Sequence, residues 1–253
     1  MGADVQKAGI WKRAGAWFLD LILLCMLAVG IGSLISLAVG YEGYNQTLQS
    51  GYDTYETQYG VTFNITQDAY QAMSQQERQN YDAAYEQLLA DDEVLYAYNM
   101  VVNLSLLTVT LSLLAASLIL EFVVPLLLKN GQTVGKKAFG IGIVRNDCVK
   151  VNTMQMFARA LLGKYTIETM IPVYIGLMVF WGVMDISGTI FLIALLIGQL
   201  VCLFVTRNNS AIHDLLAGTV AVELASQQVF ENTEALIEYT KRIHADRAAR
   251  RED

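Results

Sequence analysis

Four apolar stretches restrict this chain to folds that suit a lipid bilayer. They cover residues 14–39, 95–128, 167–184 and 187–205. A transmembrane helix needs about 20 consecutive apolar residues; the first two stretches exceed that length and the last two are near its lower limit. The last two are separated by a very short link, which favours a tight helical hairpin. The sequence therefore predicts four transmembrane helices.

The first apolar stretch lies close enough to the N-terminus to be compared with a secretory signal. Its apolar part is longer than the signal core of about 7–15 residues, and "SLAVG" offers no convincing cleavage site. We interpret it as a retained span. A cleaved signal peptide is the alternative interpretation.

The distribution of lysine and arginine predicts the orientation. These residues precede the first stretch, separate the second from the third and follow the fourth, whereas Arg78 is the only one in the loop at 40–94. That loop carries ten acidic residues, so the net charge of −7 belongs mostly to it and indicates nothing about partners. Because positively charged loops stay in the cytoplasm, we expect a multi-pass protein of the cell membrane with both termini cytoplasmic.

The segments outside the apolar stretches differ in composition. We expect a single membrane domain over 1–253 with three elaborations: an extracytoplasmic acidic, Tyr- and Gln-rich insertion at 41–94, a cytoplasmic basic loop at 129–165, and a cytoplasmic helical tail at 225–253. In the insertion, Ser74 and Glu77 form a capping-box pattern, which predicts a helix over 75–90. The part before it is expected to be a partly ordered cap.

Short alternating segments in the cytoplasmic part predict a small β-sheet. "FGIGIVR" and "VKV" lie on either side of "NDC", and "TVAVEL" follows the fourth apolar stretch. A further helix is expected to begin near Thr153. The predicted fold class is thus an all-α membrane protein with a small cytoplasmic sheet and an extracytoplasmic helical loop.

Two acidic residues lie inside the first two apolar stretches, where a charge costs about 2.5 kcal/mol or more. Counted from the cytoplasmic ends, Asp20 and Glu121 lie at similar depth. Pro125 lacks the N–H that would bond the carbonyl of Glu121, which leaves an additional oxygen free. Such oxygens suit a cation or a proton site. The alternative is a kinked helix whose Glu121 pairs with a basic residue.

Four further charged or titratable residues are expected near the cytoplasmic ends of the spans. Arg13 lies at the inner headgroups, and Arg159 precedes the third stretch. Ser210 is expected to cap a short helix, ended by Gly218, that carries His213 and Asp214. Because histidine titrates near neutral pH, His213 beside Asp214 suggests proton transfer; a purely structural role for Asp214 is the alternative.

Small residues recur every four positions in the outer halves of the first two stretches, a spacing that lets helices approach closely. They predict a tight seam between these two helices, with homodimerisation as the alternative use. The residues are Ala28, Gly32, Ser36 and Gly40 in the first stretch, and Thr108, Ser112 and Ala116 in the second.

Several site classes have no pattern in the sequence. The three cysteines are scattered, which favours reduced structural thiols. "GQTVGKKA" is too short between its glycines for a phosphate loop, and no Ser or Thr follows its lysine. We find no catalytic constellation, metal-ligand spacing or nucleic-acid motif, and we expect neither an enzyme nor a cofactor.

Taken together, "KRAGAWFLD" with Arg13 and Asp20, and "IHDLLAGTVAV" with Asp214, resemble the RDD family of bacterial membrane proteins. "NGQTVGKKAFGIGIV" and the later "FAR" resemble that family's central stretch. The chain departs from the family in having "NDC" where a glycine commonly ends the inner turn. The resemblance implies a role in transport, and cation–proton exchange has been attributed to some members.

Two functions follow as hypotheses. In the first, the chain transports small cations or protons: Asp20 and Glu121 bind the ion, Arg13 and Arg159 set their charge, and Asp214 with His213 shapes the inner mouth. A homo-oligomer would complete a pathway that four helices leave thin. In the second, the chain is a membrane scaffold that recruits another membrane protein, and the buried charges hold the bundle together.

Overall fold

The computed structural model describes residues 5–128, 130–180, 182, 186–206 and 210–252. The predicted link between the third and fourth apolar stretches lies largely outside the described residues. The chain divides into two compact units, one formed by Met1–Leu27 and Leu113–Asp253, and the other by Ala28–Ser112. We call them unit 1 and unit 2 and describe each by itself.

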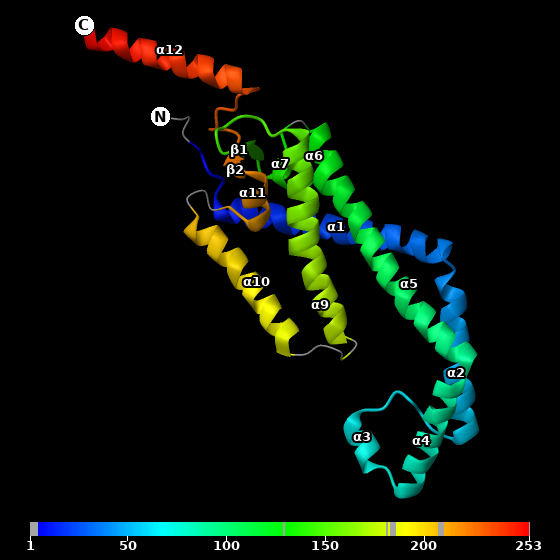
Figure 1. Cartoon of the computed structure of the whole chain (residues 1–253). Coiled ribbons are helices and arrows are strands. Elements are labelled where there is room, and N and C mark those ends of the chain that lie inside the picture. The colour runs from blue at the N-terminus through cyan, green and yellow to red at the C-terminus, as the bar shows by residue number, and fades with distance from the viewer. Residues whose placement is uncertain (1–4, 129, 181, 183–185, 207–209, 253) are drawn as a thin grey trace. The chain divides into compact units, whose positions relative to one another are not determined.

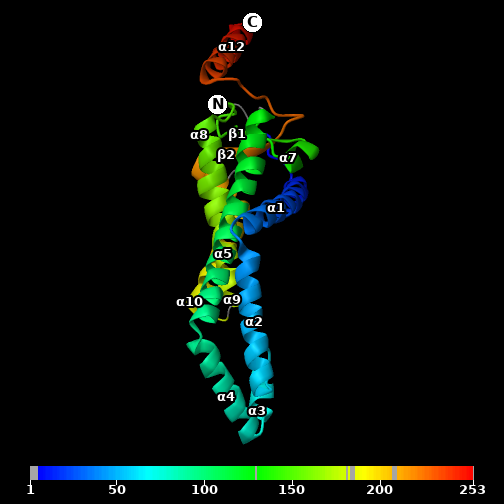
Figure 2. The same ribbon diagram turned by 90° about the vertical axis from the view of Figure 1, so that its right-hand side faces the viewer.

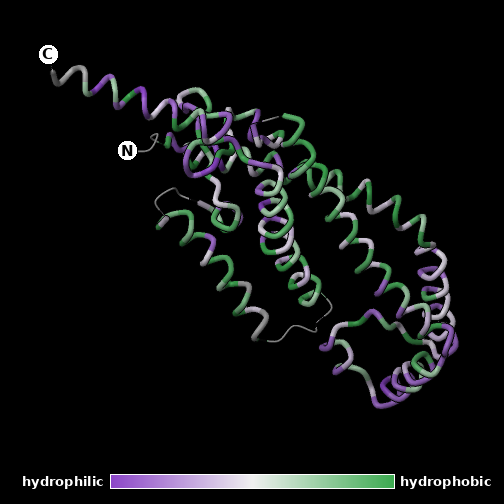
Figure 3. Tube along the Cα trace, turned by 45° about the horizontal axis from the view of Figure 1, so that its top comes forward, coloured by the Kyte–Doolittle hydropathy of each residue, from purple (hydrophilic) through white to green (hydrophobic). Residues whose placement is uncertain are grey.

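Two helices are long and apolar enough to cross a bilayer. One is α1 (Ile10–Ala38), and the other is the continuous run Asp92–Leu127, which contains α5 (Asp92–Ser117), a π-helix η1 (Leu118–Val123) and α6 (Val124–Leu127). They coincide with the first two predicted stretches. Figure 3 shows hydrophobic residues along both helices and hydrophilic residues along the C-terminal helix α12 (Thr233–Glu252).

A second helical run in unit 1 joins three elements, α8 (Thr153–Phe157), the π-helix η2 (Ala158–Met170) and α9 (Ile171–Phe180). It starts at Thr153, as predicted, after the N-cap Asn152. The run continues through the predicted limit of the basic loop at 165. Helix α10 (Ile186–Val205) packs against α9 (Figure 1).

The sheet of unit 1 has two antiparallel strands, β1 (Ile141–Arg145) and β2 (Thr219–Glu223), preceded by the short helix α7 (Val134–Ala138). The segment before α1 adds an isolated bridge to the edge of this sheet, where Lys7 pairs with Val222. The prediction of a third strand at "VKV" was wrong: Val149 and Lys150 form only isolated bridges.

The segment "VKV" leaves β1 soon after a tight turn and therefore does not become a strand. The chain reverses at Asn146–Cys148, so Arg145 bonds Val149 across the turn. Cys148 has φ 65°, in the left-handed region that favours glycine. The returning segment then leaves the sheet to bond Phe230.

The short helix α11 (Ile212–Ala217) lies between α10 and β2. The predicted cap was wrong by one residue: Ala211 is the N-cap and no side chain caps it. The backbone N–H of Ser210 instead bonds the Thr206 hydroxyl. Gly218, with φ 63°, ends the helix as predicted, and β2 starts directly after it.

Unit 2 contains the acidic insertion, which is helical from its start. Helix α2 (Tyr41–Tyr59) replaces the expected partly ordered cap, and α3 (Gln67–Ala72) and α4 (Gln75–Ala90) follow. The predicted capping box of Ser74 and Glu77 is present. Helices α2 and α4 pack against each other and are joined through α3 (Figure 2). The unit's apolar core consists of Leu48, Leu88, Val94 and Ala97.

The close approach predicted for small residues is present within unit 2. A Cβ added to Gly32 would lie 3.5 Å from the Ser112 Cβ and 3.6 Å from the Thr108 Cγ2. These are ordinary van der Waals distances, so the space between α1 and α5 at Gly32 would hold a methyl group.

Candidate functional site

The first part of the site is a buried ion-pair network centred on Asp214 of α11. Its Oδ1 accepts hydrogen bonds from Arg159 Nε at 3.0 Å and from the Thr219 hydroxyl at 3.2 Å. Its Oδ2 lies 3.5 Å from a terminal guanidinium nitrogen of Arg13. The Asp214 and Arg159 side chains are 1% and 3% exposed, so the network lies in a low-dielectric interior.

The fold explains why residues so distant in sequence meet. The segment before α1 is bonded to β2, because Ala8 N–H donates to the Ala221 carbonyl. This places Arg13, in the first turn of α1, beside Asp214 in the first turn of α11. Helix α11 packs against η2, which carries Arg159.

Electrostatics keep Asp214 ionised. Burial alone would raise the pKa of its carboxyl group, but the positive charges of Arg159, His213 and Arg13 lower it well below its ordinary value. Within the described part of the chain, Oδ2 has no hydrogen-bond partner. One oxygen of this carboxylate is therefore held by charge alone.

Asp20 is held separately, by the segment that starts α7. Its two carboxylate oxygens accept bonds from the Thr133 hydroxyl at 2.5 Å and from the Gly135 backbone N–H at 2.7 Å. The Lys136 ammonium lies 3.7 Å from Oδ2. Asp20 is 5% exposed, and the N-terminal end of α7 favours its negative charge.

Glu121 lies in η1 and is paired with Lys164 of η2. The π-helix precedes Pro125, where Val124 N–H bonds the Ile119 carbonyl five residues earlier. A proline removes a backbone donor, and the helix adjusts around it by this wider register. The alternative that Glu121 pairs with a basic residue is thus the arrangement found.

A third arrangement centres on His213. Its Nδ1 lies 2.7 and 2.8 Å from the two carboxylate oxygens of Glu168, and its Nε2 lies 3.6 Å from Asp214 Oδ2. Gln199 of α10 also donates to Glu168, at 3.0 Å. The imidazole therefore lies between two carboxylates and connects them.

These side chains surround a cavity of about 540 Å³ in unit 1. This volume is in the range of small-molecule sites, about 300–1,000 Å³. Charged side chains and apolar residues of α1 and α10 line it. Seven titratable residues line it, and Asp20 and Glu121 pair with two of these. We call all nine the buried charge cluster: Arg13, Asp20, Glu121, Lys136, Arg159, Lys164, Glu168, His213 and Asp214.

All six residues proposed from the sequence fall in unit 1, and four of them are directly connected: Arg13, Arg159, His213 and Asp214. Asp20 and Glu121 have no direct contact with each other among the described residues; each faces a different lysine.

Sequence reasoning missed Lys136, Lys164 and Glu168 as members of the site. The two lysines were counted only as markers of orientation. Glu168 lies at the start of the third apolar stretch, four residues after Lys164, which is a signal that could have revealed it.

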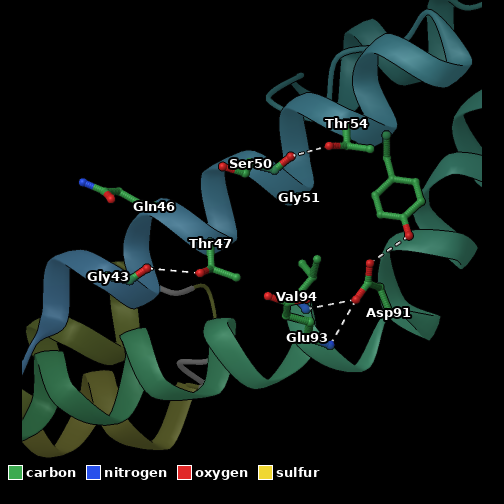
Figure 4. A pocket seen from close by; sticks show the side chains of 10 residues that line it. Gly43, Gln46, Thr47, Ser50, Gly51, Thr54, Asp91, Glu93 and Val94 are labelled. Carbon is green, nitrogen blue, oxygen red and sulfur yellow. Dashed lines mark hydrogen bonds between the residues drawn. The ribbon is translucent and has the colours of Figure 1, made fainter.

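A second cavity, of about 440 Å³, lies in unit 2 and is lined by polar residues of α2 and the start of α5 (Figure 4). The hydroxyls of Thr47 and Thr54 there donate to carbonyls of their own helix. Asp91 accepts bonds from the Tyr55 hydroxyl and from backbone N–H groups. These groups serve the local fold. No cluster of three potential metal ligands occurs among the described residues.

Comparison with known proteins supports the resemblance carried by Arg13, Asp20 and Asp214. The RDD family matches residues 7–218, which include every residue of the buried charge cluster. Comparisons with curated proteins and with solved structures found no match. Family membership and the two long apolar helices indicate a membrane protein. The chain belongs to the RDD family.

Proposed function

We propose that this protein is a proton-coupled transporter of the cell membrane, with four transmembrane helices and both termini in the cytoplasm. The observation that carries the proposal is the position of His213 between Glu168 and Asp214, beside a cavity of about 540 Å³. Histidine is the side chain whose ordinary pKa suits proton exchange near neutral pH.

The pairing of the acids favours a proton as the coupled charge. Asp20, Glu121 and Asp214 each face a lysine or arginine, so a metal cation arriving at any of them meets a positive charge already in place. Cation–proton exchange at Asp20 or Glu121 requires that the facing lysine lose its proton or move away. A proton taken up by His213, which lies between the Glu168 and Asp214 carboxylates, requires neither.

Protein reconstituted into liposomes with a pH-sensitive dye inside tests the proposal. Imposed pH and solute gradients are expected to drive proton movement in the wild type, and His213→Gln is expected to abolish it. His244, the other of the chain's two histidines, is exposed on α12, and His244→Gln is the matched control with unchanged flux. Proton movement in His213→Gln equal to that of the wild type contradicts the proposal.

The competing function is a membrane scaffold, and complete pairing of the buried acids favours it. A scaffold requires that these pairs stabilise the bundle without moving protons. Wild-type liposomes without any gradient-driven proton flux, together with lost folding in Asp214→Asn, would support this role.

The topology is tested independently. In a variant without native cysteines, Asp68→Cys in the acidic insertion is expected to react with a membrane-impermeant maleimide added outside intact cells. Asp246→Cys in the exposed tail helix is expected to react only after the cells are opened. Labelling of both positions from outside contradicts four spans with cytoplasmic termini.

A further inference from the structure

The cavity of unit 1 has walls of two different kinds. Four basic residues and two acidic residues line it: Arg13, Lys136, Arg159, Lys164, Glu168 and Asp214. The other two acids of the cluster, Asp20 and Glu121, are not among the lining residues and lie behind the lysines that they pair with. A molecule in the cavity therefore meets an excess of positive charge.

The rest of the lining is largely apolar. It includes Trp17 of α1 and residues of α10, among them Leu196, Leu200 and Phe204. Their exposed fractions, 53% for Leu196, 55% for Leu200 and 67% for Phe204, leave this surface uncovered within unit 1.

We propose that the cavity binds a monocarboxylate with a single apolar chain, its carboxylate at the basic wall and its chain along α10. Two observations on independent parts of the site point to this occupant. The excess of basic groups on one wall selects an anion, and the apolar wall selects a chain. A guanidinium fork and ammonium groups are the donors that bind carboxylates in proteins.

The charge balance connects this site to the proposed function, on which it rests: the carboxylate is the solute that moves with the proton. With His213 neutral, the cluster holds four basic and four acidic groups. An added carboxylate leaves one unbalanced negative charge, which is costly in a low-dielectric interior. A proton on His213, which faces Glu168 on η2 and Asp214 on α11, restores the balance, so one anion enters with one proton.

Photocrosslinking in nanodiscs of zwitterionic lipid tests the site directly, on the full chain. The probe is decanoate with a diazirine in its chain, and mass spectrometry locates the label. We expect labelling of α10 between Leu196 and Phe204. Unlabelled decanoate should compete for the label, and decyltrimethylammonium, with a chain of the same length and the opposite charge, should not.

A matched pair of variants on α10 tests the position of the chain. Leu200→Trp fills the cavity and is expected to reduce labelling at least about tenfold. Ile197→Trp adds the same bulk at a position of equal exposure, 55%, that does not line the cavity, and is expected to label like the wild type. Equal labelling of the two variants overturns the proposal.

Two competition results also overturn it. If decyltrimethylammonium competes for the label as well as decanoate does, the cavity does not select an anion. Competition by an anionic phospholipid but not by decanoate shows that the cavity is a lipid site.

The assay separates this inference from the proposed function. Specific labelling without proton flux in liposomes leaves the site standing and refutes transport. Proton flux without decanoate-competed labelling refutes the carboxylate site and leaves proton coupling standing.

Discussion

The Asp214 carboxylate accepts a hydrogen bond from Arg159 Nε at 3.0 Å, and the two side chains are 1% and 3% exposed. Two other basic groups, Arg13 and His213, lie within 3.6 Å of its second oxygen. Asp214 thereby joins α11 to α1 and η2, and its single negative charge balances guanidinium groups from elements distant in sequence.

Removing the charge of Arg159 should therefore destabilise the protein strongly. Arg159→Gln leaves Asp214 buried with less compensation, and the loss of one partner from a buried pair costs about 3–5 kcal/mol. The free energy of unfolding in detergent measures it. Arg145→Gln, which removes a half-exposed partner of Asp147, is the control, and we expect a change within about 0.5 kcal/mol. Similar losses in the two variants would contradict the central role of Arg159.

Gly135 has no room for a side chain. An added Cβ would collide with the Ala16 carbonyl and would lie 2.8 Å from the Asp20 carboxylate. Gly135→Ala should separate α7 from α1 and cost about 1–3 kcal/mol, as overpacking does. Gly176→Ala on α9, where nothing lies within 4 Å, should be neutral or stabilising. Thermal unfolding of the two variants compares them; equal midpoints would contradict the close approach.

Lys136 should make stability depend on alkaline pH. Burial lowers its pKa from 10.5 to about 8, although Glu121 and Asp20 oppose the shift. Between these two values the unfolded chain binds more protons than the folded one, so the free energy of unfolding rises with pH, by at most about 1.4 kcal/mol per unit. Below pH 8 both the folded and the unfolded state bind the proton, so Lys136 adds no dependence on pH there.

The test compares wild type with Lys136→Gln from pH 7 to 10.5. Above pH 8, the free energy of unfolding of the wild type should rise relative to that of Lys136→Gln. Parallel curves across this range would show that Lys136 has an ordinary pKa in the folded protein.

The seam of unit 2 should accept a methyl group at Gly32 but not a larger side chain. A Cβ there makes ordinary contacts with Ser112 and Thr108, so Gly32→Ala should fold normally, whereas Gly32→Leu should force α1 and α5 apart. Gly30→Leu is the control, since nothing lies within 4 Å of its Cβ position. Thermal unfolding of each variant measures the effect; a midpoint for Gly32→Leu equal to that of Gly30→Leu would contradict the prediction.

Hydropathy and capping patterns predicted the elements that depend on local sequence. The long apolar runs gave α1 and the helix through Leu127, and Ser74 with Glu77 located the start of α4. Helix α2 was missed because no capping motif marks its start: its N-cap is Gly40, and no side chain caps it. The strand expected at "VKV" did not form because Val149 and Lys150 leave β1 after the turn and pair with Phe230.

The sequence predicted many of the residues that belong to the site, but it did not predict which of them pair with each other. Depth counted from the helix ends placed Asp20 and Glu121 at one level, but it gave no information on neighbours from distant segments. Lys136 and Lys164 reach the two acids from α7 and η2, and such tertiary contacts have no periodic signature in one sequence.

The attachment of Asp20 to Thr133 and Gly135 has a mechanical consequence. Both donors are electrically neutral, so loss of a proton from Lys136, which also donates to the Thr133 hydroxyl, removes neither of these two hydrogen bonds. When Lys136 loses or gains its proton, α1 and the segment that leads into β1 therefore stay hydrogen-bonded to each other. Any rearrangement that opens the cavity must therefore move α10 or η2 against this fixed frame.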